Sequence, residues 1–375
     1  MVDTSAPPLL LDPRDPLSTS FRSAIEDRIA AFLAGQSGPL NALRPEIDPL
    51  LQLTERLLEG GKRLRPAFCV WGYVAAAGPD IAEPALGALL DAAAGLELLH
   101  ASALVHDDVM DGSDTRRGAP SVHRQLEALH VREGRLGEPE PFGRAGAILL
   151  GDLLIMWSVE MLERAGLPAS RAAAAYEIAQ RMRTEVTCGQ YLDVVAQSQP
   201  LGGHLEQTLA AANRVVEFKS ARYTVYRPAQ LGATIGGGSP ALLDALAAYG
   251  SPLGRAFQFR DDLLGVFGDP AVTGKPVGDD LREGKRTVLI AATLARTDDA
   301  GRRLLGDRLG DPALDAAGVA ALQRVIVDCG AHQAVEAMIT ACYDEAVAAL
   351  DAAGVDPAGR AALTALATAA VQRAT

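Results

Sequence analysis

Apolar residues recur every three or four positions through most of the chain, which is the period of an amphipathic α-helix. Alternation with a period of two, typical of a half-buried strand, is almost absent, and alanine, leucine, glutamate and arginine dominate. Glycine and proline clusters separate the periodic stretches. The pattern predicts helices over residues 18–34, 43–58, 64–77, 84–111, 120–130, 142–165, 168–197, 204–232, 239–266, 285–296, 313–329, 331–352 and 357–373.

The helical stretches form one uninterrupted series. They show no repeat of fixed period, which argues against a solenoid, and no change of composition that would divide the chain in two. Several stretches are long enough to cross a domain of this size. We therefore expect an all-α fold, a single large helical bundle over residues 17–375, preceded by a flexible, proline-rich tail over residues 1–16.

Composition and charge narrow the classes of function. The 375 residues are 49% hydrophobic, which excludes a disordered protein, and the formal net charge is -12. That negative charge argues against a nucleic-acid partner, so any anionic ligand must be held by a local basic cluster. The start of the chain lacks the pattern of a signal peptide, and no stretch of about 18 uninterrupted apolar residues predicts a transmembrane segment. We expect a soluble, cytoplasmic protein.

The first acidic cluster closes a long apolar helix. Asp107, Asp108 and Asp111 are three and four positions apart and share one helix face. The negative end of the helix dipole disfavours carboxylates there, so the arrangement is costly unless a cation binds. Oxygen ligands without sulfur indicate Mg²⁺, with phosphate as a co-ligand. Taken alone, the cluster could also be a solvated acidic helix end.

A second acidic pair, Asp261 and Asp262, also follows an apolar helical run. One such pair is a weak signal, because an exposed acidic helix end has the same sequence. Two pairs that each close a long apolar helix could face one another across the core. Carboxylate metal sites in helical bundles are built from facing helices in this way.

Basic clusters accompany the acidic ones. Lys62, Arg63 and Arg65 lie just ahead of the point where a proline begins a helix, so their charges oppose the helix dipole until an anion binds. Arg116 and Arg117 follow the first acidic cluster by five residues. Each cluster alone could be a solvated surface group, but together they predict a diphosphate site beside metal ions.

Eight motifs occur in a fixed order: GGKRLRP, ELLHASALVHDDVMD, RRG, AILLGD, GQYLD, FKSARY, AFQFRDD and GKPVGDDLREGKRT. The series resembles the trans-isoprenyl diphosphate synthase (polyprenyl synthetase) family, most closely the bacterial geranylgeranyl diphosphate synthases. The resemblance implies the isoprenoid synthase fold, a bundle around a deep central cavity, usually as a homodimer. It also implies a transferase that condenses isopentenyl diphosphate head-to-tail with an allylic diphosphate, assisted by three Mg²⁺ ions.

The resemblance also implies a role for individual residues. The metal ligands would be Asp107, Asp108, Asp111, Asp261 and Asp262. The pocket for the diphosphate of isopentenyl diphosphate would comprise Lys62, Arg65, His100 and Arg117. The allylic diphosphate would be held by Arg116, Lys219 and Lys275, and the allylic cation would face oxygens of Lys219, Ser220 and Gln258.

The chain departs from the family pattern at two places. Ser220 stands where the family usually has threonine, and Gly265 stands where the second acidic motif usually ends in aspartate. The missing carboxylate is one that the family tends to use through water. Asp269 is a candidate to compensate for it.

Product length depends on the residues that precede the first acidic cluster. In the family, bulky aromatic residues four and five places before the first aspartate stop elongation early, whereas this chain has Ala103 and Ser102 there. Leu99 lies a further turn away and could close the pocket. These small residues favour geranylgeranyl diphosphate (C20), with a longer prenyl chain second and farnesyl diphosphate (C15) third.

Two further functions are compatible with parts of the sequence. A class I terpene cyclase shares the fold and an acidic motif, but it needs no second diphosphate pocket and should carry a different second metal motif. A non-catalytic synthase subunit typically loses one acidic motif. The chain keeps GGKRLRP, the complete first motif and the leading pair of the second, so both alternatives are less favoured.

Overall fold

The computed structural model describes residues 10–201, 205–270, 276–351 and 354–372, and these residues are mostly helical. The short strands β1 (Thr115–Arg116) and β2 (Ala119–Pro120) pair as an antiparallel hairpin. The helices are α1 (Thr19–Leu40), the 3₁₀ turn η1 (Asn41–Leu43), α2 (Asp48–Leu58), α3 (Leu64–Ala77), α4 (Ala85–Asp111), α5 (Val122–Arg132), α6 (Pro139–Glu163), α7 (Ala169–Gln197), α8 (Leu205–Val215), the π-helical segment η2 (Val216–Tyr226), α9 (Arg227–Gly236), α10 (Pro240–Phe267), α12 (Asp279–Glu283), α13 (Val288–Arg296), α14 (Asp299–Arg308), α15 (Ala316–Asp328), α16 (Ala331–Asp351) and α17 (Pro357–Val371).

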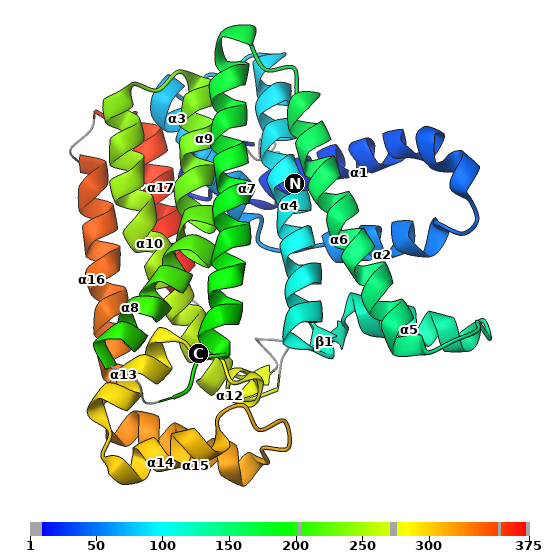
Figure 1. Ribbon diagram of the computed structural model, residues 1–375. Helices are drawn as coiled ribbons and strands as arrows, with labels where there is room; N and C mark the ends of the chain where they lie inside the picture. Colours follow the sequence, from blue (N-terminus) through cyan, green and yellow to red (C-terminus); the bar gives the residue numbers. More distant parts are fainter. Residues whose placement is uncertain (1–9, 202–204, 271–275, 352–353, 373–375) are drawn as a thin grey trace, which may run out of the picture.

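The long helices pack side by side into one bundle (Figure 1). The most extensive contacts join α3 to α9, α4 to α6 and α10 to α16. The short helices α14 and α15 cover the lower end of the bundle, and α1, α2 and α5 project to one side (Figure 1). The expected all-α bundle is therefore confirmed.

Helix α4 forms the centre of the part of the bundle that carries the first acidic cluster. Its sequence is apolar on nearly every face, and most of its side chains are buried against α1, α3 and α6. A helix that is apolar all round is buried on all sides in a globular protein. Burial of α4 thus fixes the position of Asp107 and Asp111 at its carboxyl end.

The structure refines the expected helix boundaries. The predicted helix over residues 204–232 is divided into α8, η2 and α9, and π-helical turns of this kind are often found at functional sites. Helix α14 and the β1–β2 hairpin were not predicted. At the amino end, Pro16 is buried and its carbonyl accepts a hydrogen bond from Trp71 Nε1 (3.4 Å), so the described part of the expected tail packs against the bundle.

Two helices, α4 and α6, are long and apolar enough to cross a membrane by length and composition alone. The sequence had predicted no such segment. The most apolar 18-residue stretch of α4 is 78% buried, as in a core helix, whereas that of α6 is 44% buried. Helix α6 therefore exposes an apolar side.

Candidate active site

A cavity of about 850 Å³ opens where the ends of α4, α7 and α10 meet the loop before α3. Its lining contains residues from both acidic clusters and both basic clusters. The predicted site residues that line it are Lys62, Arg65, His100, Ala103, Asp107, Arg116, Arg117, Lys219, Ser220, Gln258, Asp261 and Asp262. Lys275 lies outside the described residues. The structure thus brings together segments that are far apart in the sequence.

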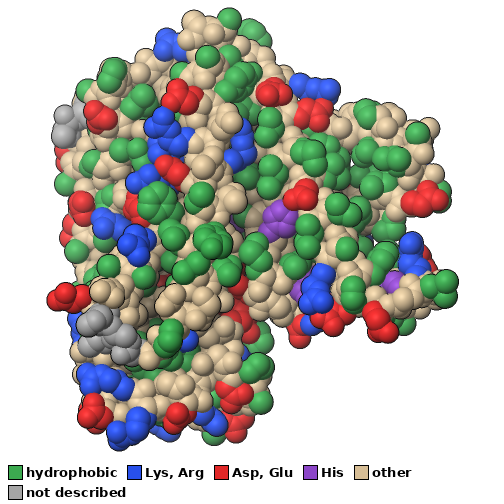
Figure 2. Space-filling model, viewed as in Figure 1, with side chains coloured by type: hydrophobic (Ala, Val, Ile, Leu, Met, Phe, Trp, Pro, Cys, Tyr) green, Lys and Arg blue, Asp and Glu red, His purple; other side chains and the backbone are tan. Residues whose placement is uncertain are grey.

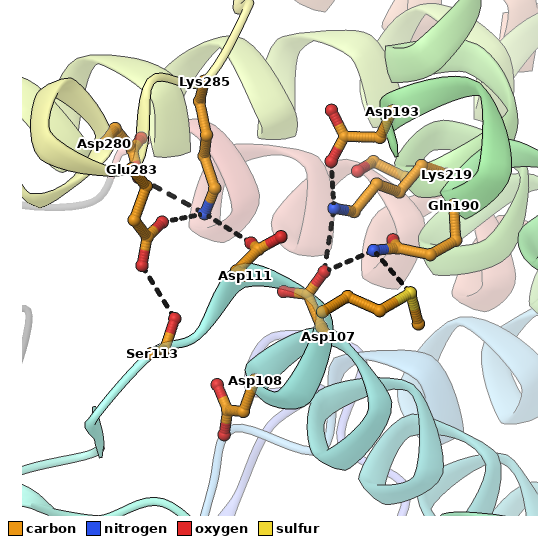
Figure 3. Close-up of polar contacts among 12 residues, drawn as sticks. Asp107, Asp108, Asp111, Ser113, Gln190, Asp193, Lys219, Asp280, Glu283 and Lys285 are labelled. Carbon is orange, nitrogen blue, oxygen red and sulfur yellow. Dashed lines mark hydrogen bonds and ion pairs between the residues drawn. The ribbon is translucent and has the colours of Figure 1, made fainter. Parts of the chain in front are cut away.

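Asp107 is held by groups from two other elements (Figure 3). Its Oδ1 accepts hydrogen bonds from Lys219 Nζ (2.9 Å) and Gln190 Nε2 (2.8 Å). Lys219 Nζ also donates to Asp193 Oδ2 (2.6 Å), so it lies between two carboxylates. Burial favours the neutral form of Asp107, but the charges of Lys219 and Lys285 outweigh it and lower the pKa of Asp107. Asp107 is therefore ionised.

Asp111 faces a second buried lysine (Figure 3). Lys285 Nζ lies 3.3 Å from Asp111 Oδ2, 3.5 Å from Asp280 Oδ1 and 2.7 Å from Glu283 Oε2. Burial and the neighbouring Asp107 charge raise the pKa of Asp111 to about 6. The carboxyl end of α4 is thus surrounded by cations that keep its carboxylates in place.

Asp108 lies apart from the other two aspartates of its cluster. It is 2% exposed, does not line the cavity, and accepts a hydrogen bond from Arg116 Nε at 2.9 Å. Figure 3 shows its side chain on the side of α4 that faces away from Lys219 and Lys285. The expectation that all three aspartates share one helix face is wrong for Asp108, because residues at consecutive helix positions diverge by about 100° around the axis. Asp111 lies on the side of Asp107 and meets Lys285, but of the three only Asp107 lines the cavity.

The second acidic pair lies on α10. Asp262 is 3% exposed, its Oδ1 accepts a hydrogen bond from Gln258 Nε2 (2.9 Å), and its buried Oδ2 has no hydrogen-bond partner. Burial raises the pKa of Asp262 to about 8, and the neighbouring Asp280 and Asp261 charges act in the same direction. A buried carboxylate oxygen without a partner is costly, and it suits a position that a cation can occupy.

The donors of this region can be tested against a divalent cation. No three acidic, histidine or cysteine side chains among the described residues converge closely enough to hold an ion by themselves. The cavity nevertheless presents hard oxygen ligands on two facing helix ends, and Asp262 Oδ2 is unpartnered. Mg²⁺ is commonly bound by one or two carboxylates together with substrate phosphates. The residues therefore fit Mg²⁺ when a diphosphate supplies the remaining oxygens.

The basic cluster at the start of α3 also lines the cavity. The Arg65 guanidinium lies over the Tyr223 ring, 4.2 Å from its centre, and donates to Thr224 Oγ1 (3.0 Å). The Tyr223 hydroxyl is 2.9 Å from His100 Nδ1. Burial and the charges of Arg65 and Arg117 hold the pKa of His100 well below its usual range, so this ring is neutral. Arg65 and His100 are thus held in place by their neighbours before an anion binds.

Arg63 has a different role from its two basic neighbours. Its guanidinium is buried and donates to Glu97 Oε2 (2.8 Å) on α4. Its backbone adopts φ of 53°, a region that disfavours side chains, and strain of this kind is concentrated at functional sites. Arg63 lines the cavity together with Lys62 and Arg65, but its guanidinium is paired with Glu97. Glu97 is a carboxylate inside an otherwise apolar helix. This position in the sequence was the available sign that it pairs with a buried cation such as Arg63.

Several polar residues of the site were not predicted from the sequence. Gln190 and Asp193 on α7 bind the first acidic cluster and its lysine, and Lys285 contacts Asp111. Tyr223 orders Arg65 and His100. Polar residues that interrupt apolar helices were the available signal, but sequence alone did not show which of them meet.

The apolar part of the cavity lies beyond Asp107. Ala103 on α4 lines it, together with Val186 on α7 and Ala212 on α8. Of the other two residues expected to set product length, Ser102 and Leu99 are buried and do not line the cavity. The neighbouring helices α7 and α8 supply walls that the sequence could not place.

Comparisons with known proteins agree with this geometry. The polyprenyl synthetase family model matches residues 48–326. A geranylgeranyl diphosphate synthase of Mycobacterium tuberculosis is 35% identical over 78% of this chain and 74% of its own length. A (2E,6E)-farnesyl diphosphate synthase of Mycobacterium bovis is 34% identical over 72% of this chain and 67% of its own.

A solved structure extends the similarity to the fold. The geranylgeranyl pyrophosphate synthase of Corynebacterium glutamicum, complexed with isoprenyl diphosphate and magnesium, superposes with a TM-score of 0.90. It is 41% identical, and the match covers 97% of this chain and all of that one. Because sequence, fold and cavity agree over most of its length, the chain belongs to the polyprenyl synthetase family, whose members are prenyl diphosphate synthases.

Proposed function

We propose that the protein condenses isopentenyl diphosphate with an allylic diphosphate and releases mainly geranylgeranyl diphosphate. The observation that carries the proposal is the division of one cavity into an acidic side, a basic side and an apolar extension. Two diphosphates of different chemistry can be held there while a growing hydrocarbon chain enters the apolar part. A terpene cyclase would have no use for the basic side.

The acidic side is assigned to the allylic diphosphate. Asp107, Asp111 and Asp261 would hold Mg²⁺, of which we propose three per site, with Asp262 in support. Mg²⁺ held there would supply positive charge that neutralises the diphosphate departing from the allylic carbon. Lys219 and Arg116 add positive charge, so negative charge that develops on the leaving group is stabilised in a preorganised site.

The basic side is assigned to isopentenyl diphosphate. Lys62, Arg65 and Arg117 would bind its diphosphate, with neutral His100 beside them. The allylic C–O bond breaks, the terminal alkene carbon of isopentenyl diphosphate forms the new C–C bond, and one proton is lost to regenerate an alkene. We assign that proton to the departed diphosphate. Orientation of the two substrates supplies much of the rate.

The allylic cation requires stabilisation between these two events. The Ser220 hydroxyl donates to Gln258 Oε1 (2.5 Å), and both residues line the cavity beside Lys219. Their oxygens line the same cavity as the apolar extension, so they are suited to face an allylic cation. Ser220 keeps the hydroxyl that threonine usually supplies at this position in the family.

Geranylgeranyl diphosphate is proposed as the main product because Ala103 leaves the apolar extension open. The relatives include both C20 and C15 synthases, so the comparisons leave the chain length open. We also propose that the synthase domain covers residues 17–375, that the protein is cytoplasmic, and that it is a homodimer. Exposed apolar residues on α6, among them Leu149 and Met156, support an interface there (Figure 2).

The test is a product assay with Mg²⁺, isopentenyl diphosphate and each allylic primer in turn. We expect a C20 diphosphate as the main product and no product without the divalent cation. Conversion of an allylic diphosphate to a cyclic hydrocarbon without isopentenyl diphosphate would contradict the proposal. A main product longer than C20 or of C15 would keep the reaction and reject the chain length.

A further inference from the structure

The segment η2 contacts both sides of the cavity. Lys219 Nζ donates to Asp107 Oδ1 (2.9 Å) on the acidic side. Four positions later, the Tyr223 ring stacks on the Arg65 guanidinium on the basic side, with 4.2 Å between the ring centre and Arg65 Cζ. A change of helical register within η2 would therefore move these two contacts relative to each other.

The turn that ends η2 is π-helical. The backbone N–H of Arg227 bonds to the carbonyl oxygen of Arg222, five positions earlier, whereas an α-helix bonds positions four apart. Tyr223 lies inside this turn. Because π-helical turns are rare and occur mostly as single turns within α-helices, we expect contacts from outside the segment to hold this one.

Glu185 on α7 binds the side chains of the same two arginines. Its Oε1 accepts hydrogen bonds from Arg222 Nη1 (2.8 Å) and Arg227 Nη2 (2.6 Å), and its Oε2 accepts one from Arg227 Nε (2.8 Å). Burial favours the neutral form of Glu185, but the hydrogen bonds from both arginines outweigh it and lower the pKa of this carboxyl. One ionised carboxylate thus joins the two ends of the π turn.

This pairing depends on the π register. In an α-helix, side chains five positions apart point about 140° apart around the axis, so they would not converge on one carboxylate. The wider π turn brings Arg222 and Arg227 towards the same side, where both meet Glu185. Glu185 therefore stabilises the π form of this turn over the α form.

The network continues away from the cavity. Arg222 Nε donates to Glu217 Oε1 (2.8 Å), and Glu217 Oε2 accepts a hydrogen bond from Ser251 Oγ (2.8 Å) on α10. None of these side chains, nor those of Glu185 and Arg227, is among the described residues that line the cavity. The network can therefore act on a substrate in the cavity only through η2.

We propose that Glu185 is a positioning residue that holds the π turn from Arg222 to Arg227 and thereby keeps Tyr223 against Arg65. The inference rests on the proposed function, which assigns Arg65 to isopentenyl diphosphate. Without the carboxylate, the turn can relax towards an α-helix and rotate Tyr223 away from Arg65. Binding of isopentenyl diphosphate should then weaken more than binding of the allylic diphosphate.

The first test is the steady-state kinetics of Glu185→Gln, with each substrate varied in turn. Glutamine keeps the shape of the side chain but replaces one acceptor oxygen with a donor, which an arginine cannot accept. We expect KM for isopentenyl diphosphate to rise by about tenfold and KM for the allylic diphosphate to change by less than about twofold.

Glu177→Gln is the matched control. It makes the same change on the same helix and breaks an exposed ion pair with Arg181 (2.6 Å), so both KM values should stay at those of the wild type. Equal increases of both KM values in folded Glu185→Gln, or wild-type values of both, would overturn the inference.

A second measurement reports on the turn itself. Hydrogen–deuterium exchange of the unliganded proteins should be faster in Glu185→Gln than in the wild type over residues 216–227 and unchanged in α4 and α16. Wild-type exchange over residues 216–227, or faster exchange throughout the chain, would overturn the inference. This measurement does not depend on the proposed function, which is decided by the product assay of the wild-type protein.

A double variant tests whether Glu185 acts through Arg65. In Arg65→Gln/Glu185→Gln, KM for isopentenyl diphosphate should equal that of Arg65→Gln alone, because the group that Glu185 positions is already lost. A further increase as large as that in Glu185→Gln alone would contradict the proposed route. If Glu185→Gln does not fold, Arg222→Gln breaks the same network at a more exposed side chain (28% against 13%) and should show the same difference between the two KM values.

Discussion

The small side chain of Ala103 lines the apolar extension of the cavity. It lines the cavity one turn before Asp107, whereas Ser102 is buried outside the lining. Ala103→Phe should place an aromatic ring across the extension and shorten the main product to C15 or C10. Ser102→Ala is the control and should leave the product unchanged. Chromatography of the dephosphorylated products measures the shift, and a C20 product from Ala103→Phe would show that the chain takes another path.

His100 links the stability of the fold to pH. Burial and the surrounding arginine charges hold its pKa well below the unfolded value of about 6.5. Below that pH the unfolded state binds a proton that the folded state rejects, so the free energy of unfolding falls as the pH is lowered. Above that pH His100 is neutral in both states and contributes no pH dependence.

The variant His100→Asn should therefore lose less stability than the wild type between pH 7.5 and pH 5.5. Denaturant unfolding at the two pH values measures the difference. Equal losses in the two proteins would mean that His100 is protonated in the folded state.

At the scale of elements, the contact between α7 and η2 brings Gln190 and Asp193 to Lys219. Gly189 allows this contact, because a β-carbon there would overlap the backbone of Phe218 and Lys219. Gly189→Ala should force the two elements apart, lower the free energy of unfolding by about 1–3 kcal/mol, and reduce kcat.

Gly35→Ala on α1 is the matched control. Nothing lies within 4 Å of its added β-carbon, so alanine should leave kcat unchanged and stabilise the helix by up to about 1 kcal/mol. Thermal unfolding and steady-state kinetics report both effects. If Gly189→Ala were as well tolerated as Gly35→Ala, the close contact would not be needed to place Lys219.

The helices could be predicted from sequence because their apolar periods are long and their breakers are clear. Helix α14 was missed because its sequence is rich in charge, although Asp298 caps it by accepting a hydrogen bond from Gly301 N (2.8 Å). The π-helical turns of η2 have no periodic signal distinct from an α-helix. They place Lys219, Ser220 and Tyr223 around the cavity.

The parts of the site that consist of charged residues close together in the sequence could be predicted. The parts in which tertiary packing determines which residues meet could be predicted less well. The acidic and basic clusters converge as expected, because they lie at the ends of helices that cross the same bundle. Asp108 turns away from the cavity because it pairs with Arg116, and Arg63, although it lines the cavity, is paired with the buried Glu97.

The surroundings of Gly265 show the same limit. Asp269, the candidate to compensate for the missing carboxylate, is exposed beyond the end of α10 and does not line the cavity. The approach of Asp280 on α12 to Gly265 on α10 depends on two helices whose contact no local pattern encodes.

At the scale of the whole molecule, the exposed apolar side of α6 supports a dimer. Leu149 is 62% exposed and Met156 is 59% exposed. Leu149→Glu should place a charge in the proposed interface and shift the protein towards monomer in sedimentation velocity experiments. Leu136→Glu changes an even more exposed leucine in the loop after α5 and should leave the assembly unchanged. A wild-type monomer at micromolar concentration would contradict the homodimer.

In the proposed reaction, the two sides of the cavity bind two different substrates. Steady-state kinetics of Arg65→Gln, with each substrate varied in turn, test this directly. Loss of a charged hydrogen bond to a diphosphate should raise KM for isopentenyl diphosphate by about tenfold or more and leave KM for the allylic diphosphate nearly unchanged. Equal increases in both KM values, or an increase confined to the allylic substrate, would contradict the assignment.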